Sequence, residues 1–553
     1  MPAAFGLAIV ATISSHSHSN YDPIARGAHH TYCAWILRKD CTADPRGKSQ
    51  WQVRGLLPSE IHLMIDHFTL SSFEFFVQPT RTRFPFRYGI ASMTDVPHFF
   101  VRTQVSTDGP ASFGLASEGL PPKWFTKDPA TTFEQDLPEM FTVIRHAADL
   151  AERIAQIPVT FFDFWRELYR QQTDWARARS LAPLLANLGV SLVERAVLDG
   201  LCRQAQQPLH RMLAENRLGL RLGEIYTELG AAPPRAWLPA APLTTCFARH
   251  TVGLGDALSP ADIPASERVD DGLPQDLESC IRAYGLRYFK VKLFADAARD
   301  LPRLRDLTRL LGSATDGRFL VTLDGNENFR DYPHFREFWE NAAADADLRE
   351  LWRCVIVVEQ PVRRDRALGN DVGAALRAWP GRPPMIIDES DGAIGDLPLA
   401  LALGYAGTSH KNCKGIVKGI ANACLLEKRR RDGERVVLTG EDLCNLGPVA
   451  LLQDLALMAL LGIEHVERNG HHYYRGLSAW PADWQSAMLA AHGDLYERHH
   501  EGFASLGIRQ GRIQLSSVNA APFGVQTLFD PARFERGLAA LTTPLPAAGC
   551  RVI

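Results

Sequence analysis

The sequence has few cysteines, little net charge and no long apolar run. Its ten cysteines are spread over 553 residues without a CxxC pair or a regular framework, so we expect reduced thiols in a cytoplasmic protein. A formal net charge of −3 and a pI near 6.7 give no electrostatic reason to expect nucleic acid or an anionic membrane as a partner. No stretch approaches the roughly 20 apolar residues that span a bilayer.

What the sequence does contain is enough apolar residues for a large core, 46% of the chain. Strand-like runs with a hairpin signal at Asp108-Gly109 come first, and helical patterns follow them, as in an α+β domain. A proline-rich linker then separates this part from a second one. We predict an irregular extension over 1–50, an α+β capping domain over 51–238, an α/β barrel over 239–500, and a C-terminal segment over 501–553 that packs on the barrel or the cap.

The second part alternates short apolar runs with helical stretches, which is typical of a parallel sheet. Eight such units over about 230 residues fit a (β/α)8-type barrel better than an open sheet. The expected strands are PLTTCFAR, YFKVKLF, RFLVTLDGNE, CVIVVEQP, PMIIDES, YAGTSHK, RVVLTGED and GIEHVER.

Charged residues recur where these strands end. Lys290 and Lys292 lie in the second strand, and the next four end at Asp324, Glu359, Asp388 and Lys411, at intervals of 32, 35, 29 and 23 residues from Lys292 onward. One βα unit of a barrel averages about 31 residues, and the carboxyl ends of its strands converge on one mouth. Each carboxylate alone is as well explained by a helix cap, but the whole series indicates one site.

Three carboxylates at one mouth repel one another unless a cation lies among them. Mg²⁺ prefers such oxygen ligands and keeps positions open for a substrate. The same site explains why Lys290 and Lys292 point to one face of an apolar strand, since they would face the acidic group. A lysine that acts as a base near pH 7 needs its pKa lowered by about 3 units, and we expect burial, the metal and the neighbouring ammonium to lower it.

This set of motifs resembles the enolase superfamily, in particular its muconate lactonizing enzyme-like subgroup within the mandelate racemase/muconate lactonizing enzyme family. The matching motifs are KVK, LDGNEN, VEQP, IDES and HKNCKG, with FRYGIAS and SLVERAVLDGLC similar to the cap and to the helix before the barrel. The resemblance implies one Mg²⁺ per site, or Mn²⁺, bound by Asp324, Glu359 and Asp388. It also implies that Lys292 and Lys411 are acid/base groups on opposite faces of a small-molecule carboxylate, that Lys290 neutralises this carboxylate, and that the chain forms a homo-oligomer.

The reaction that these residues suit is proton abstraction α to a carboxylate through an enediolate. A racemase or epimerase, a cycloisomerase and a syn-dehydratase all use this step, so the overall reaction stays open. The alternatives are an acid-sugar dehydratase and a non-catalytic barrel that binds a carboxylate ligand.

Several residues around the predicted site have a less certain place in it. Lys414 competes with Lys411 for the second acid/base role. The motifs ERNGHHYY and YERHHEG lack a third ligand at metal spacing, so we expect their histidines to face solvent. The remaining candidates for contacts with the substrate or the metal ligands are Asn326, Glu389, Glu441 at the seventh strand end, and Arg81 and Arg83 in a possible lid loop over 71–89.

Overall fold

The computed structural model of the chain describes residues 67–536, so the predicted extension over 1–50 lies outside the described residues. The described part begins with an antiparallel sheet in the order β17-β2-β3-β1-β5, with β4 on β3. The β3–β4 hairpin encloses the predicted Asp108-Gly109 turn. The strands are β1 (His67–Leu70), β2 (Glu74–Tyr88), β3 (Ala91–Ser106), β4 (Ser112–Gly119), β5 (Val159–Thr160) and β17 (Glu535–Arg536).

Helices pack on this sheet and complete the predicted α+β capping domain. The last long one, α3, lies so close to β4 that a Cβ on Gly114 would stand 1.9 Å from Ala196 O. Nearly every residue of α3 is buried, because its other side faces the barrel. The helices are α1 (Phe133–Ile154), α2 (Phe161–Arg177), α3 (Pro183–Ala205) and α4 (Leu209–Ala214).

Eight parallel strands form the barrel, and the pairing of β13 with β6 closes it. Each of the eight expected strands is present, which confirms the predicted (β/α)8-type barrel with an N-terminal cap. The strands are β6 (Thr245–Val252), β7 (Tyr288–Lys292), β8 (Leu320–Asp324), β9 (Val355–Glu359), β10 (Met385–Ile387), β11 (Gly407–His410), β12 (Val437–Gly440) and β13 (His465–Arg468).

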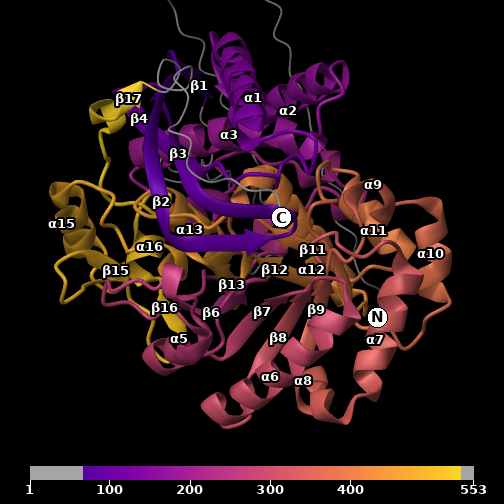
Figure 1. Cartoon of the computed structure of the whole chain (residues 1–553). Coiled ribbons are helices and arrows are strands. Elements are labelled where there is room, and N and C mark those ends of the chain that lie inside the picture. The colour runs from indigo at the N-terminus through magenta and orange to yellow at the C-terminus, as the bar shows by residue number, and fades with distance from the viewer. Residues whose placement is uncertain (1–66, 537–553) are drawn as a thin grey trace, which may run out of the picture. The chain divides into compact units, whose positions relative to one another are not determined.

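Helices between the strands surround the barrel (Figure 1). Asp276, Asp296 and Asp331 accept backbone N–H groups at the starts of three of them, which satisfies donors that a helix leaves unpaired. Gly404 and Gly462 end two others in the left-handed region that favours glycine. The helices are α5 (Leu277–Tyr284), α6 (Ala297–Thr315), α7 (Tyr332–Ala344), α8 (Arg349–Arg353), α9 (Arg364–Ala367), α10 (Asn370–Arg377), α11 (Asp396–Leu403), α12 (Ile416–Arg431) and α13 (Ala450–Leu461).

The chain after the barrel returns to both parts. Strand β16 pairs antiparallel with β6, and β17 pairs antiparallel with β2. In Figure 1 the long strands β2 and β3 run across the barrel strands. No helix among residues 67–536 is both long and apolar enough to cross a membrane. The remaining elements are α14 (Gly470–Tyr473), α15 (Ala482–Ala491), β14 (Tyr496–Arg498), β15 (Ala504–Leu506), β16 (Arg512–Gln514) and α16 (Ser516–Ala520).

Candidate active site

The strand register places the predicted charged residues in one layer. Lys292 pairs with Asp324 across β7 and β8, and Asp324 pairs with Glu359 across β8 and β9. Asp388 follows the last residue of β10, and Lys411 follows the last residue of β11. The structure thus brings these five side chains to the carboxyl end of the barrel, where barrel enzymes bind their substrates.

Lys290 lies at the centre of an acidic cluster. Its Nζ donates to Glu359 Oε1 at 2.9 Å, and to Glu441 Oε2 and Glu467 Oε2, each at 2.8 Å. The same nitrogen lies 3.0 Å from Asp324 Oδ2. Burial disfavours the ammonium form, but the four carboxylates outweigh it and hold the pKa of Lys290 well above its ordinary value.

The two predicted acid/base lysines line one cavity, together with Lys290 and Asp388. Lys292 lies on β7 and Lys411 follows β11, and these strands are four places apart in a closed barrel of eight. The two lysines therefore approach the cavity from opposite sides. Lys292 Nζ donates to Asp324 Oδ2 at 2.6 Å.

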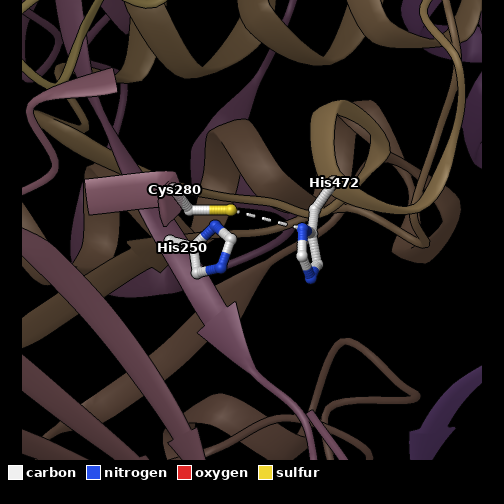
Figure 2. A group of neighbouring side chains, drawn as sticks. All are labelled: His250, Cys280 and His472. Atoms are coloured by element: carbon white, nitrogen blue, oxygen red, sulfur yellow. Dashed lines mark hydrogen bonds between the residues drawn. The ribbon is translucent and has the colours of Figure 1, made fainter. Parts of the chain in front are cut away.

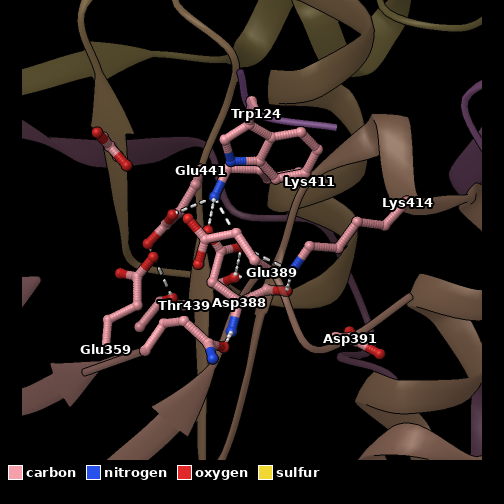
Figure 3. Close-up of polar contacts among 12 residues, drawn as sticks. Trp124, Glu359, Asp388, Glu389, Asp391, Lys411, Lys414, Thr439 and Glu441 are labelled. Carbon is pink, nitrogen blue, oxygen red and sulfur yellow. Dashed lines mark hydrogen bonds and ion pairs between the residues drawn. The ribbon is translucent and has the colours of Figure 1, made fainter. Parts of the chain in front are cut away.

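Lys411 and Lys414 both contact Asp388, but they are placed differently (Figure 3). Lys411 Nζ donates to both Asp388 oxygens at 2.8 Å and to Glu441 Oε2 at 2.5 Å, and it lies 5.3 Å from the centre of the Trp124 ring. Lys414 Nζ donates to the backbone and side-chain oxygens of Ser409 and does not line the cavity. This geometry favours Lys411 over Lys414 as the group that meets a substrate.

The protein's own groups do not lower the pKa of either acid/base lysine. Burial alone would lower the pKa of Lys292, but the Asp324 carboxylate outweighs it and raises that pKa. Burial also opposes the ammonium of Lys411, yet Asp388 and Glu441 hold its pKa well above the ordinary value. The predicted lowering by burial and by Lys290 is therefore wrong for the protein alone, because neighbouring carboxylates dominate.

Asn326 and Glu389 lie beside this layer, and both are buried. Asn326 Nδ2 donates to Glu389 Oε1 at 3.0 Å, and Asn326 N donates to Asp324 Oδ1 at 2.7 Å. Burial, with the nearby Asp388 carboxylate, raises the pKa of Glu389 to about 8. Asn326 therefore holds Asp324 in place, and burial favours the uncharged form of Glu389.

Three carboxylates of the cluster have the geometry of a metal site. One oxygen each of Glu359, Asp388 and Glu441 lies within 4.8 Å of the other two. Carboxylate oxygens are the ligands of hard cations, so these residues fit a divalent ion such as Mg²⁺. The predicted set has Asp324 in place of Glu441, and the structure places Asp324 between Lys290 and Lys292.

The two arginines predicted near the substrate do not line the cavity. They belong to β2, because the stretch interpreted as a lid loop forms a long strand paired with β3. The side chain of Arg81 is 70% exposed. The guanidinium of Arg83 is buried and donates to Asp271 Oδ1 and Oδ2, at 2.8 and 2.6 Å.

Sequence reasoning missed two groups of residues that line the cavity. Glu467 and Asn469 belong to the eighth strand and its end, where a carboxylate within IEHVERN could have been included. The second group is an apolar wall, and no periodic signal reveals it. It consists of Phe86, Tyr88, Met93, Pro121 and Trp124 from the cap, and Leu443 and Cys444 from the barrel.

The expectation that the ERNGHHYY histidines face solvent is wrong, because His471 and His472 are buried. His472 lies beside His250 and Cys280, which come from β6 and α5 (Figure 2). These partners are 222 and 192 residues away along the chain, so no local spacing could reveal them. His500, in the other motif, has a side chain that is 70% exposed.

Comparison with known proteins adds structural likeness only. No protein-family model matches the sequence, and no curated protein matches it either. Solved structures do match over most of the chain. A mandelate racemase/muconate lactonizing protein from Herpetosiphon aurantiacus is 17% identical with a TM-score of 0.50, covering 82% of this chain and 98% of its own.

Two further solved structures are similar over the same extent. A muconate lactonizing enzyme from Pseudomonas fluorescens, complexed with muconolactone, is 16% identical with a TM-score of 0.51, covering 84% of this chain and 98% of its own. A dipeptide epimerase from Enterococcus faecalis, complexed with Mg and the dipeptide L-Leu-L-Tyr, is 14% identical with a TM-score of 0.51, covering 82% of this chain and 99% of its own.

The chain has the fold of these mandelate racemase/muconate lactonizing and dipeptide epimerase structures. The resemblance carried by the strand-end motifs is thus confirmed for the architecture. In this fold the described lysines and carboxylates occupy the mouth of the barrel, under the cap strand that carries Phe86 and Tyr88.

Proposed function

We propose that this chain is a Mg²⁺-dependent enzyme that abstracts the proton α to a substrate carboxylate. The observation that carries the proposal is the pair Lys292 and Lys411, which line one cavity from opposite sides, each beside a carboxylate. Two such groups can act on the two faces of one carbon atom, as a racemase or epimerase requires. A cycloisomerase or a syn-dehydratase needs the same abstraction step.

The lysines supply both the proton transfer and part of the charge stabilisation. One of them, as the free amine, removes the α-proton, and the other returns a proton to the opposite face. Loss of the α-proton places negative charge on the substrate's carboxylate oxygens as an enediolate. The ammonium of Lys290, fixed by four carboxylates, is positioned in advance to stabilise that charge.

The metal ligands in this proposal are Glu359 and Asp388 with either Asp324 or Glu441 as the third. Mg²⁺, or Mn²⁺, bound there would supply positive charge to the substrate's oxyanion and offset the carboxylates that raise the pKa of the two lysines. Asn326 and Glu389 hold the carboxylate layer from the side.

The cavity wall suggests which carboxylates fit. Its cap side is apolar and aromatic, with Phe86, Tyr88, Met93 and Trp124, and neither Arg81 nor Arg83 reaches it. A monocarboxylate with an apolar substituent suits this wall better than a second anion or a sugar chain. The cavity measures about 40 Å³, below the roughly 300 Å³ of small ligand pockets, so binding a substrate requires side chains that line it to move.

The cavity wall and the lysine pair each weigh against one of the two alternative functions. An acid-sugar dehydratase must hydrogen-bond several hydroxyl groups, and the only polar groups that the described part of the cap places at the cavity are the indole N–H of Trp124 and the hydroxyl of Tyr88, which already donates to Pro122 O. A non-catalytic carboxylate-binding barrel needs no pair of lysines on opposite sides. Both alternatives are therefore less well supported than proton abstraction from an apolar acid.

Solvent deuterium exchange tests the proposal. Candidate α-substituted acids, from apolar monocarboxylates to dicarboxylates and sugar acids, are incubated with the full chain and Mg²⁺ in D₂O. We expect deuterium at the α-carbon of an apolar acid and a loss of about 10²–10⁴-fold in exchange for Lys292→Ala. No exchange with any acid would favour a binding protein. Loss of a β-hydroxyl to give a keto acid would favour the dehydratase.

A pair of variants tests the second acid/base group within the same assay. Lys411→Met should stop exchange on one face of the α-carbon, whereas Lys414→Met should retain it, because Lys414 does not line the cavity. The two variants remove the same charge from the same carboxylate, Asp388, so their difference reports position rather than charge. The opposite outcome would assign the role to Lys414.

A further inference from the structure

A cluster of nitrogen and sulfur ligands lies apart from the residues of the proposed catalytic site. It consists of His250 on β6, Cys280 on α5 and His472 on α14 (Figure 2). All three are buried, and one ligand atom from each lies within 4.8 Å of the other two. None of the three lines the cavity that holds the lysines.

One distance in this cluster matches an edge of a tetrahedral site. Cys280 Sγ lies 3.5 Å from His472 Nδ1, and zinc bonds of about 2.05 Å to nitrogen and about 2.3 Å to sulfur give an N···S edge of about 3.6 Å in a tetrahedron. A ligand atom of His250 lies within 4.8 Å of the other two. The neighbouring His471 has its Nε2 atom 3.1 Å from His250 Nδ1, close to the N···N edge of about 3.3 Å.

Hydrogen bonds satisfy the cluster and the neighbouring His471 only in part, although His250 Nδ1 has a partner in His471 Nε2. A thiol is a weak donor, so the contact between Cys280 and His472 offsets little of their burial. His471 Nδ1 is buried and has no hydrogen-bond partner. Burial lowers the pKa of His250 to about 4 and that of His472 well below its ordinary value, which favours the neutral imidazole form that binds metals.

The positive charge of Arg83 beside the cluster is offset by a carboxylate. Arg83 donates to the backbone oxygen of His472 at 2.6 Å, but its guanidinium also forms a two-point ion pair with Asp271. A divalent ion that replaces the thiol proton of Cys280 adds a net charge of one, and one proton leaves to solvent: Cys–SH plus M²⁺ gives Cys–S–M⁺ plus H⁺.

We propose that His250, Cys280 and His472 bind a borderline divalent cation such as Zn²⁺. Imidazole and thiolate ligands select such an ion, whereas the carboxylates at the barrel mouth select Mg²⁺. His471 is the nearest candidate for a fourth ligand, and water is the other.

The ion would join three segments that are distant in the sequence. Its ligand His472 packs edge-on against Phe84 of β2 with ring centres 4.9 Å apart, and Phe86 stacks on Tyr473 at 4.2 Å. Phe86 lines the catalytic cavity. The ion would thus fix the part of α14 on which the cap wall rests, which is a structural role.

Cobalt(II) is the probe that tests this site. The full chain is stripped with a chelator and titrated with Co²⁺ in excess Mg²⁺, which occupies the oxygen site. We expect one equivalent of tetrahedral Co²⁺ with a thiolate-to-metal charge-transfer band. Cys280→Ser should lose that band, and Cys246→Ser, which removes another buried thiol on β6, should keep it. A folded wild-type chain without the band would overturn the proposal.

A second measurement needs no variant and so does not depend on how the variants fold. X-ray absorption of the wild-type chain loaded with one equivalent of Zn²⁺ should show a sulfur neighbour at about 2.3 Å. A shell of nitrogen and oxygen only would show that other residues, such as the exposed His500, bind the ion instead, and would overturn the proposal.

Discussion

Replacing Lys290 by methionine tests how far the buried lysine holds the acidic cluster together. The ammonium is 1% exposed and lies within 3.0 Å of Asp324, Glu359, Glu441 and Glu467. Methionine keeps most of the volume and leaves four buried carboxylates without their shared cation. Removing one partner of a buried ion pair costs about 3–5 kcal/mol. For a chain of this length, a loss of stability of this size lowers Tm by about 3–5 °C.

The same substitution should change the response to magnesium. Lys290 repels a cation from the oxygens that would bind it, so Lys290→Met should bind Mg²⁺ more tightly than the wild type. A tenfold gain in affinity adds about 1.4 kcal/mol to the stabilisation at saturating Mg²⁺. Calorimetric unfolding scans with chelator and with excess Mg²⁺ measure both effects, and titration calorimetry gives the Kd directly.

Lys418→Met is the matched control. Lys418 is another buried barrel lysine, and its Nζ donates to the backbone oxygen of Asp391 at 3.0 Å as well as to that carboxylate. We expect a similar loss of stability in chelator without any gain in Mg²⁺ affinity. Equal Mg²⁺ responses in the two variants, or an unchanged Tm for Lys290→Met, would refute the picture of a lysine that occupies the metal cluster.

Three further predictions concern the cap and its contact with the barrel. Burial, helped by Arg195, lowers the pKa of His98 to about 3. Between pH 6.5 and 3 only the unfolded chain takes up this proton, so the free energy of unfolding decreases by about 1.4 kcal/mol for each unit by which the pH is lowered. Urea titrations at several pH values should show a smaller decrease for His98→Phe. Arg195→Met should cost about 3–5 kcal/mol in urea unfolding, because it leaves Glu118 buried and unpaired, and adding Glu118→Gln should recover part. Gly114→Ala should lower Tm through its clash with Ala196 O, a loss of about 1–3 kcal/mol, and an unchanged Tm would contradict the close packing of β4 on α3.

The barrel was predictable because its signals are local. Each parallel strand is buried on both faces and therefore appears as a short apolar run, and a charged residue ends several of these runs. Burying a charge is costly, so Lys290 and Lys292 in an apolar strand required acidic partners. The strand order then fixes which charged residues meet, without knowledge of any side-chain conformation.

The cap wall and the histidine cluster were not predictable, for a different reason. Buried and less buried side chains alternate without a break from Thr80 to Tyr88, so the inward direction of Phe86 follows from the strand itself. What the sequence does not show is that this face of β2 covers the mouth of the barrel. The cluster requires the fold to bring Cys280 to His472 across 192 residues. Long-range contacts of this kind leave no spacing in the sequence.

The helix SLVERAVLDGLC also carries charges inside an apolar segment, although there they join the cap to the barrel. Glu194 and Arg195 lie in an apolar helix, and both side chains are fully buried. Arg195 donates to Glu118 of the cap, whereas Glu194 accepts the backbone N–H groups of Ile416 and Val417, at the start of the barrel helix that follows Lys411 and Lys414. A charge inside an apolar segment therefore predicts that a partner exists, but not whether the pair serves catalysis or assembly. Only an opening to a cavity, which Lys292 and Lys411 have, separates the two.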